Sequence, residues 1–193
     1  MTVHSPIAAP SDQRVYRFTQ RDYMLLAENG AFDQHAKTEL IEGVIYAVNA
    51  QYSRHARVQT ALVRRLADAC DAIGEGWAAL VEPSIALSER SMPQPDVVVV
   101  QHAPDDGPIP SSNVRIVVEV ADSTLDNDLG PKAGIYAVAN IAEYWVADTG
   151  ARIIHQFFAP EGGRFTGRAQ VSFGEPITSA AFAPLKIETS ALD

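Results

Sequence analysis

Apolar residues recur at helical spacing in two stretches of the chain. Across Ser53–Ile73 they lie on one side of a helix, and Gly74 then supplies the stop. This is the strongest helical pattern in the sequence. A shorter helix is predicted to begin after Thr19, which caps it together with Asp22, and to stop at the Asn-Gly pair at 29–30.

Runs of β-branched and aromatic residues predict the strands. Residues 38–48 are expected to form one bent strand or a tight hairpin around Gly43. Residues 96–100 and 114–120 are continuous apolar runs, which is typical of buried central strands. Pro131 favours the first turn of a helix that runs to Ala139. The remaining strands are predicted over 78–87, 143–148, 152–158 and 164–173.

The order of these elements predicts an α/β (α+β) fold with a mixed central β-sheet flanked by helices. Residues 1–14 are rich in Pro, Ser and Ala, and we expect them to form a flexible N-terminal tail. Residues 15–193 are expected to form a single domain, because a chain of 193 residues has room for one substantial core.

The composition excludes several classes of protein. A single cysteine, Cys70, excludes an internal disulfide framework and a zinc site built from several thiolates. No apolar run reaches the roughly 20 residues of a membrane span, and the N-terminus lacks the pattern of a signal peptide. We therefore expect a cytoplasmic protein that does not associate with a membrane.

The charge balance bears on possible partners. A net charge of −9 disfavours a basic nucleic-acid footprint over the whole surface. Residues 1–65 carry eight basic and six acidic side chains, whereas residues 66–193 carry seven basic and 18 acidic ones. A polyanion would therefore have to approach the N-terminal part, or a metal ion would have to neutralise an acidic pocket.

Two carboxylates mark the ends of the two apolar runs. Asp96 opens the first run and Glu119 nearly closes the second. If the runs pair as an antiparallel hairpin with Val100 near Val114, position 96 falls opposite about position 118. Adjacent, partly desolvated carboxylates repel each other unless a cation or proton intervenes, and Mg²⁺ is often held by one or two carboxylates. The alternative is that Asp96 forms a turn and Glu119 pairs with an arginine.

Lys132 is a candidate for the same chemistry. At the second position of the helix predicted from Pro131, its charge meets the positive end of the helix dipole. The dipole would lower its pKa, which suits a group that positions or deprotonates a water molecule. The alternative is a solvated surface lysine. Tyr136 follows one turn later on the same face and is expected to pack over it.

An ordered set of short motifs spans about residues 15–190. The chain resembles the Uma-two family of restriction endonucleases, within the PD-(D/E)XK nuclease superfamily. The motifs that carry the resemblance are Glu39-Leu40-Ile41-Glu42-Gly43, His55, Pro95-Asp96, Val118-Glu119-Val120, Ser123-Thr124, Asp128, Lys132, Tyr136 and Glu143-Tyr144-Trp145.

The resemblance implies a restriction-endonuclease-like core and a metal site. Asp96 and Glu119 would match the metal-binding carboxylates, and the main-chain carbonyl of Val120 would be a further oxygen ligand. Two residues after Glu119 the chain has Ala121, where the superfamily has lysine. The family resembles variants in which the lysine has migrated to the next helix, and Lys132 fits that position.

The resemblance also assigns an early acidic residue, which such nucleases use to bind metal or hold water. Glu39 matches it. Glu39 and Glu42 would point to opposite faces of a strand, so only one of them can face the site directly. We favour Glu39, because Glu42 and Gly43 fit a turn.

Side chains on the long helix are candidates for substrate binding. His55 could touch a substrate phosphate, hydrogen-bond to Glu39, or serve as a structural histidine. Arg54 and Arg57 could contact phosphates, together with Arg64 and Arg65, although such residues often form only a solvated helix face.

The resulting hypothesis is a Mg²⁺-dependent endonuclease that hydrolyses DNA phosphodiester bonds, with Mn²⁺ as a possible substitute. Asp96, Glu119, Lys132 and Glu39 would be catalytic, and a homodimer would suit the cutting of two strands. Two alternatives remain open. One is an inactive nuclease-like module for binding or assembly, and the other is a metal-dependent hydrolase of small phosphate compounds.

Overall fold

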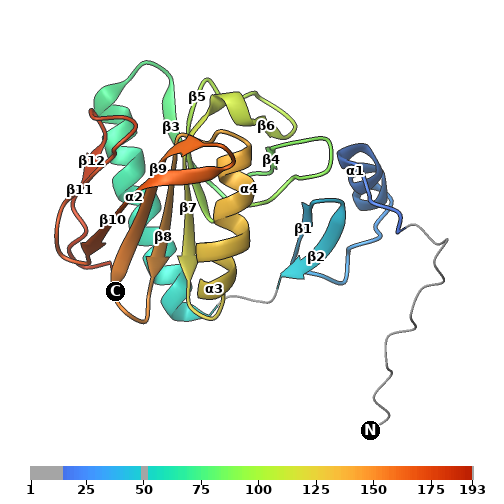
Figure 1. The fold of residues 1–193 in the computed structure, drawn as a ribbon, viewed down its shortest axis with the longest axis horizontal. Helices are drawn as coiled ribbons and strands as arrows, with labels where there is room; N and C mark the ends of the chain where they lie inside the picture. Colours follow the sequence, from blue (N-terminus) through green and yellow to red (C-terminus); the bar gives the residue numbers. More distant parts are fainter. Residues whose placement is uncertain (1–14, 49–51, 193) are drawn as a thin grey trace, which may run out of the picture.

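The computed structural model describes residues 15–48 and 52–192 (Figure 1). The tail predicted over residues 1–14 lies outside this range. In chain order the elements are α1 (Gln20–Glu28), β1 (Lys37–Ile41), β2 (Val44–Val48), α2 (Ser53–Ile73), β3 (Trp77–Val81), β4 (Ile85–Ala86), β5 (Val97–Gln101), β6 (Ile109–Pro110), the 3₁₀ turn η1 (Ser111–Asn113), β7 (Val114–Ala121), α3 (Leu125–Asn127), the π turn η2 (Asp128–Lys132), α4 (Ala133–Val138), β8 (Glu143–Asp148), β9 (Ile153–Glu161), β10 (Arg164–Ser172), β11 (Ile177–Thr178) and β12 (Lys186–Ile187).

Six strands form the central sheet, in the order β10-β9-β8-β7-β5-β3. Neighbouring strands are antiparallel except for β7 and β8, which run parallel and are joined by the helical segment α3-η2-α4. The sheet is therefore mixed, as predicted. The strands β7 and β8 lie at its centre, and β5 lies between β7 and the edge strand β3. The side chains Val97, Val98, Val99 and Val100 of β5 are fully buried.

Two apolar layers cover the sheet, one on each face. The first packs Leu62 and Leu66 of α2 against Val97 and Val118. The second packs Tyr136 of α4 against Val98 and Val117, which alternate along the strands with the side chains of the first layer. Because successive side chains of a strand point to opposite faces, α2 and α4 lie on opposite sides of the sheet (Figure 1). The fold confirms the predicted arrangement of a sheet between helices.

The N-terminal elements form a smaller unit beside the sheet (Figure 1). Thr19 and Asp22 make the predicted capping box of α1, and β1 and β2 form the hairpin that was one of two possibilities for this segment. At the hairpin turn, Glu42 and Gly43 both have positive φ angles, of 50° and 77°. Leu40 packs with residues of α1 and also bridges to Met92, which ties the hairpin to the rest of the chain.

Two sequence predictions are wrong in detail. The strand predicted over 78–87 ends at Val81, because Glu82 takes a left-handed φ of 49° and Pro83 has no N–H to donate. The helix predicted to begin at Pro131 begins at Leu125 instead. Pro131 lies inside the π turn, where the wider turn accommodates a residue without an N–H donor.

Candidate active site

The carboxylates of Asp96 and Glu119 lie at the same end of β5 and β7. Val97 pairs with Val118, so Asp96, one residue before β5, falls beside Glu119. The predicted pairing of Val100 with Val114 is confirmed, and a register shift next to it moves the partner of position 96 by one residue. Both carboxylates are almost completely buried and line a cavity of about 1670 Å³.

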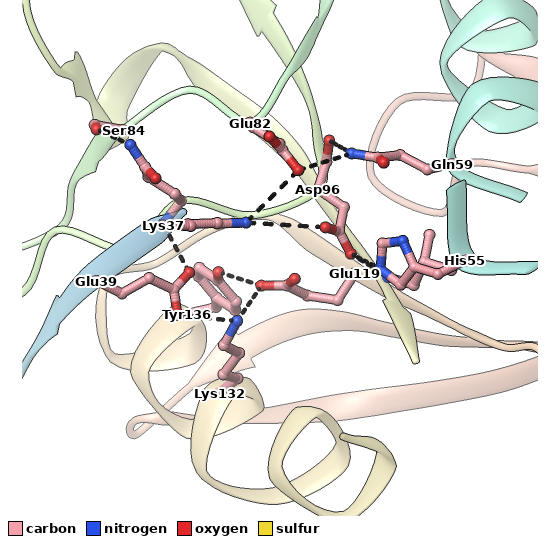
Figure 2. A network of polar contacts seen from close by, with 12 residues as sticks. Lys37, Glu39, His55, Gln59, Glu82, Ser84, Asp96, Glu119, Lys132 and Tyr136 are labelled. Carbon is pink, nitrogen blue, oxygen red and sulfur yellow. Dashed lines mark hydrogen bonds and ion pairs between the residues drawn. The ribbon is translucent and has the colours of Figure 1, made fainter. Parts of the chain in front are cut away.

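Asp96 is held by three elements (Figure 2). Its Oδ2 accepts hydrogen bonds from His55 Nε2 on α2 at 3.0 Å and from the main-chain N–H of Val120 at 2.7 Å. Its Oδ1 lies 4.0 Å from the Lys37 ammonium on β1. Burial alone would raise the pKa of Asp96, but these donors and charges outweigh it and lower the pKa below its usual value. Asp96 is therefore ionised at neutral pH.

Glu119 lies in a different environment. Its Oε1 accepts hydrogen bonds from the Lys132 ammonium and the Tyr136 hydroxyl, both at 2.9 Å. Within the described part of the chain, its other oxygen has no hydrogen-bond partner. Burial raises the pKa of Glu119 to about 8, because the nearby Asp96 and Glu39 charges add to the burial effect and Lys132 only partly offsets it.

The structure corrects the predicted setting of Lys132. This lysine closes the π turn well inside a helical segment, so no helix N-terminus lowers its pKa. Burial does act against its charge, but the carboxylates of Glu119, Glu39 and Asp128 outweigh burial and raise the pKa above its usual value. Lys132 therefore carries a proton, and a solvated surface lysine is excluded because its side chain is 11% exposed.

Of the two early glutamates, Glu39 faces the buried cluster that contains Asp96 and Glu119. Its Oε2 lies 3.4 Å from the Lys132 ammonium, and its Oε1 accepts a hydrogen bond from the Gln94 main-chain N–H at 2.9 Å. Glu42 occupies the exposed hairpin turn, as the sequence favoured. Ala121, two residues after Glu119, is buried in the core, and the ammonium that contacts Glu119 is that of Lys132 in the helical segment.

The structure adds Lys37, which the sequence analysis missed. Its ammonium lies 4.0 Å from both Asp96 Oδ1 and Glu82 Oε1 (Figure 2). Lys37 stands two residues before Glu39 on the same strand, so both side chains project from one face. This spacing of two residues could have identified Lys37 from the sequence, but the predicted strand begins at residue 38 and leaves Lys37 out.

Of the predicted substrate-binding residues, His55 and Arg54 lie at or beside the cavity, whereas Arg57 does not line it. His55 enters the site, but its partner is Asp96 rather than Glu39. Arg54 lies 3.7 Å from Asp122, which lines the cavity. Arg57 is exposed and is not among the cavity-lining residues. Of the other two helix arginines, Arg65 bonds to the main chain near the C-terminus instead.

The donor set suits a hard cation. Among the described residues, no three or more His, Cys, Asp or Glu side chains are arranged to hold a metal ion together. Mg²⁺ needs fewer protein ligands, because water and substrate phosphate oxygens complete its coordination. Asp96 and Glu119 supply carboxylate oxygens at one place. The carbonyl of Val120 leaves the strand on the same side as its N–H, which donates to Asp96.

The site and the fold define a class of protein, the nucleases with a restriction-endonuclease-like core. The family model described as "Uma2: Putative restriction endonuclease" matches residues 21–191, and the chain belongs to this family. No curated protein matches the chain. Within the described residues, no helix is long and apolar enough to cross a membrane.

A solved structure shares the fold. It is the crystal structure of a protein from Anabaena variabilis described as a "putative nuclease belonging to DUF820". The TM-score is 0.67 at 14% sequence identity, and the match covers 91% of this chain and 97% of that one. The similarity therefore extends over nearly the whole of both chains.

Proposed function

We propose that this protein is a Mg²⁺-dependent endonuclease that hydrolyses DNA phosphodiester bonds, with Lys132 as a migrated catalytic lysine. The observation that carries the proposal is the convergence of Glu39, Asp96, Glu119 and Lys132 in one buried cluster that lines a large cavity. These residues come from four separate parts of the chain. Membership of the Uma2 family supports the same activity.

Asp96 and Glu119 are the residues that would hold the ion, with the Val120 carbonyl as a third oxygen. The bound ion would polarise a phosphoryl oxygen and stabilise the charge that develops there. His55 and the Val120 N–H fix one oxygen of Asp96, so they keep its carboxylate in a single orientation. His55 is a positioning residue in this scheme.

Lys132 and Glu39 would act on the attacking water. Because Lys132 is protonated, it serves as a hydrogen-bond donor and a positive charge rather than as a base. Glu39 is fixed by the Gln94 N–H and lies against the same ammonium, so it can accept a hydrogen bond from that water. The water oxygen attacks phosphorus, one P–O ester bond breaks, and a phosphomonoester and a free hydroxyl result.

The test is cleavage of supercoiled plasmid in Mg²⁺, in Mn²⁺ and in EDTA. We expect the parent to cut in either ion but not in EDTA. Asp96→Asn and Lys132→Met should lower the rate by about 100-fold or more, because each removes charge that acts on the transition state. Asp105→Asn, in an exposed loop, is the matched control and should cut like the parent.

Equal background cutting by the parent and the Asp96→Asn variant would contradict the proposal. Circular dichroism should show that each variant folds. Bis(p-nitrophenyl) phosphate provides a second arm. If the parent hydrolyses this small diester but leaves both plasmid and a DNA single strand intact, the protein is a hydrolase of small phosphate compounds instead.

A further inference from the structure

Exposed aromatic and aliphatic side chains gather at the mouth of the catalytic cavity. Tyr46 is 50% exposed, Tyr52 is 77% exposed and Val138 is 68% exposed. All three line the cavity, although they come from β2, the N-cap position before α2 and the end of α4. Exposed tyrosines at a cavity mouth offer flat apolar faces to whatever enters.

Tyr46 lies next to one of the proposed catalytic residues. It is the cross-strand partner of Glu39 in the β1-β2 hairpin, so the two side chains project from the same face. Directly paired side chains start about 5 Å apart at their Cβ atoms. Glu39 in turn contacts the Lys132 ammonium. A group that stacks on Tyr46 would therefore lie next to the phosphate on which the proposed reaction takes place.

The charge of the cavity argues against binding by phosphate contacts alone. Counting the described residues, its lining includes six carboxylates, those of Glu39, Glu42, Asp96, Glu119, Asp122 and Asp128, but only three lysine or arginine side chains. Lys37 and Lys132 are already engaged with carboxylates, which leaves Arg90 as the exposed cation of this lining. Duplex DNA is bound mainly through many such cations. Single strands are bound to a large extent by aromatic stacking.

We propose that the strand that enters this cavity is unpaired, and that one of its bases stacks on Tyr46 beside the reacting phosphate. The inference rests on the proposed nuclease function and narrows its substrate to single-stranded or locally opened DNA. A base within a duplex has both faces covered by its neighbours, so it cannot offer one to Tyr46. Tyr52 and Val138 would bound the same entrance.

The test measures binding rather than cleavage. Fluorescence anisotropy would compare three labelled probes in Ca²⁺, which takes oxygen ligands as Mg²⁺ does. The probes are a short DNA single strand, the same sequence as a duplex, and a strand of abasic sites. We expect the parent to prefer the single strand over the duplex and the abasic strand by about tenfold or more.

Variants separate stacking from other contacts. Tyr46→Ala should weaken single-strand binding about tenfold, whereas Tyr46→Phe keeps the ring and should bind like the parent. Tyr46→Ala should leave binding of the abasic strand unchanged. Tyr16→Ala is the matched control, because Tyr16 is 68% exposed but does not line the cavity.

The inference is overturned if the duplex binds as tightly as the single strand, if Tyr46→Ala binds like the parent, or if no probe binds. Its failure is distinguishable from failure of the nuclease proposal. Plasmid cutting that needs Asp96 but not Tyr46 would leave only the nuclease proposal standing. Tyr46-dependent binding without any cutting would leave only the stacking site.

Discussion

Two carboxylates of the site ionise differently although they lie side by side. Asp96 accepts hydrogen bonds from His55 and a main-chain N–H, and its pKa falls. Glu119 is fully enclosed, and its pKa rises to about 8. Burial acts on both groups, so the difference comes from the donors and the cation around Asp96 and from the neighbouring carboxylates that add to the burial effect at Glu119. The consequence is that, in the metal-free protein at neutral pH, Asp96 stays charged while Glu119 mostly keeps its proton.

The raised pKa of Glu119 predicts how stability depends on pH. Between its usual value of 4.5 and about 8, the unfolded chain loses this proton while the folded protein keeps it. The free energy of unfolding should therefore fall as pH rises through this window, by up to about 1.4 kcal/mol for each pH unit. Urea denaturation of the metal-free protein at pH 5 and pH 8 measures the change.

Glu119→Gln should flatten this dependence, because the amide does not titrate. Glu28→Gln, on an exposed position of α1, is the control and should keep the slope of the parent. If the parent and Glu119→Gln lose stability in parallel between pH 5 and pH 8, Glu119 does not hold a proton in the folded state.

At the scale of the elements, the β1-β2 hairpin delivers Lys37 and Glu39 to the site. Its turn depends on Gly43, which has a φ of 77°. A Cβ atom at this glycine would lie 2.6 Å from the Arg17 Cβ and 3.1 Å from the Phe18 carbonyl oxygen. The turn therefore demands glycine both for its backbone angle and for the close approach of the preceding segment.

Gly43→Ala should destabilise the protein and also reduce cleavage, because the hairpin must shift to relieve the contact. Gly107→Ala is a matched control, since Gly107 has a φ of 80° but open space around it. We expect Gly107→Ala to cost about 1 kcal/mol from the backbone angle alone, and Gly43→Ala to cost clearly more. Equal denaturation midpoints for the two variants would show that the contact with Arg17 is not limiting.

The elements also show what the sequence could and could not predict. The bounds of α2 follow from a local pattern that its buried face confirms, through Val58, Leu62 and Leu66. The sequence predicts the start of the helical segment before Lys132 too late, because a proline usually marks the first turn of a helix. The π turn that contains Pro131 has no recognisable sequence pattern. The approach of Lys37 to Asp96 joins strands far apart in sequence, so only the tertiary fold reveals it.

For the whole molecule, the lone cysteine is a probe of cooperative unfolding. Cys70 lies on α2, is fully buried in the layer beneath the sheet, and belongs to the same cluster as Leu66 and Val118. Burial, with a smaller effect from Asp71, raises the pKa of its thiol to about 11. Since the thiolate is the reactive form, the folded protein presents a thiol that is both covered and uncharged at pH 8.

We therefore expect Ellman's reagent to modify the folded protein slowly at pH 8 and the denatured chain at once. The rate should rise steeply through the guanidinium concentration that unfolds the sheet. Cys70→Ala provides the blank. Complete modification of the folded protein within the mixing time would mean that α2 detaches from the sheet without global unfolding.

The sequence predicted which residues meet at the candidate site better than it predicted their charge states. The strand ends that bring Asp96 and Glu119 together follow from two apolar runs and their pairing. The charge state of Lys132 did not follow, because it depends on three carboxylates from distant segments rather than on the position of the lysine in its helix.

The β1-β2 hairpin is a separate two-stranded sheet. It is joined to the rest of the protein partly through the bridge between Leu40 and Met92. Glu39, one of the four proposed catalytic residues, thus belongs to this hairpin together with Lys37. The carboxylates that would receive the ion, those of Asp96 and Glu119, lie at the ends of the central-sheet strands β5 and β7. If the hairpin separated from the rest of the chain while the central sheet stayed folded, the proposed catalytic activity would be lost before global unfolding.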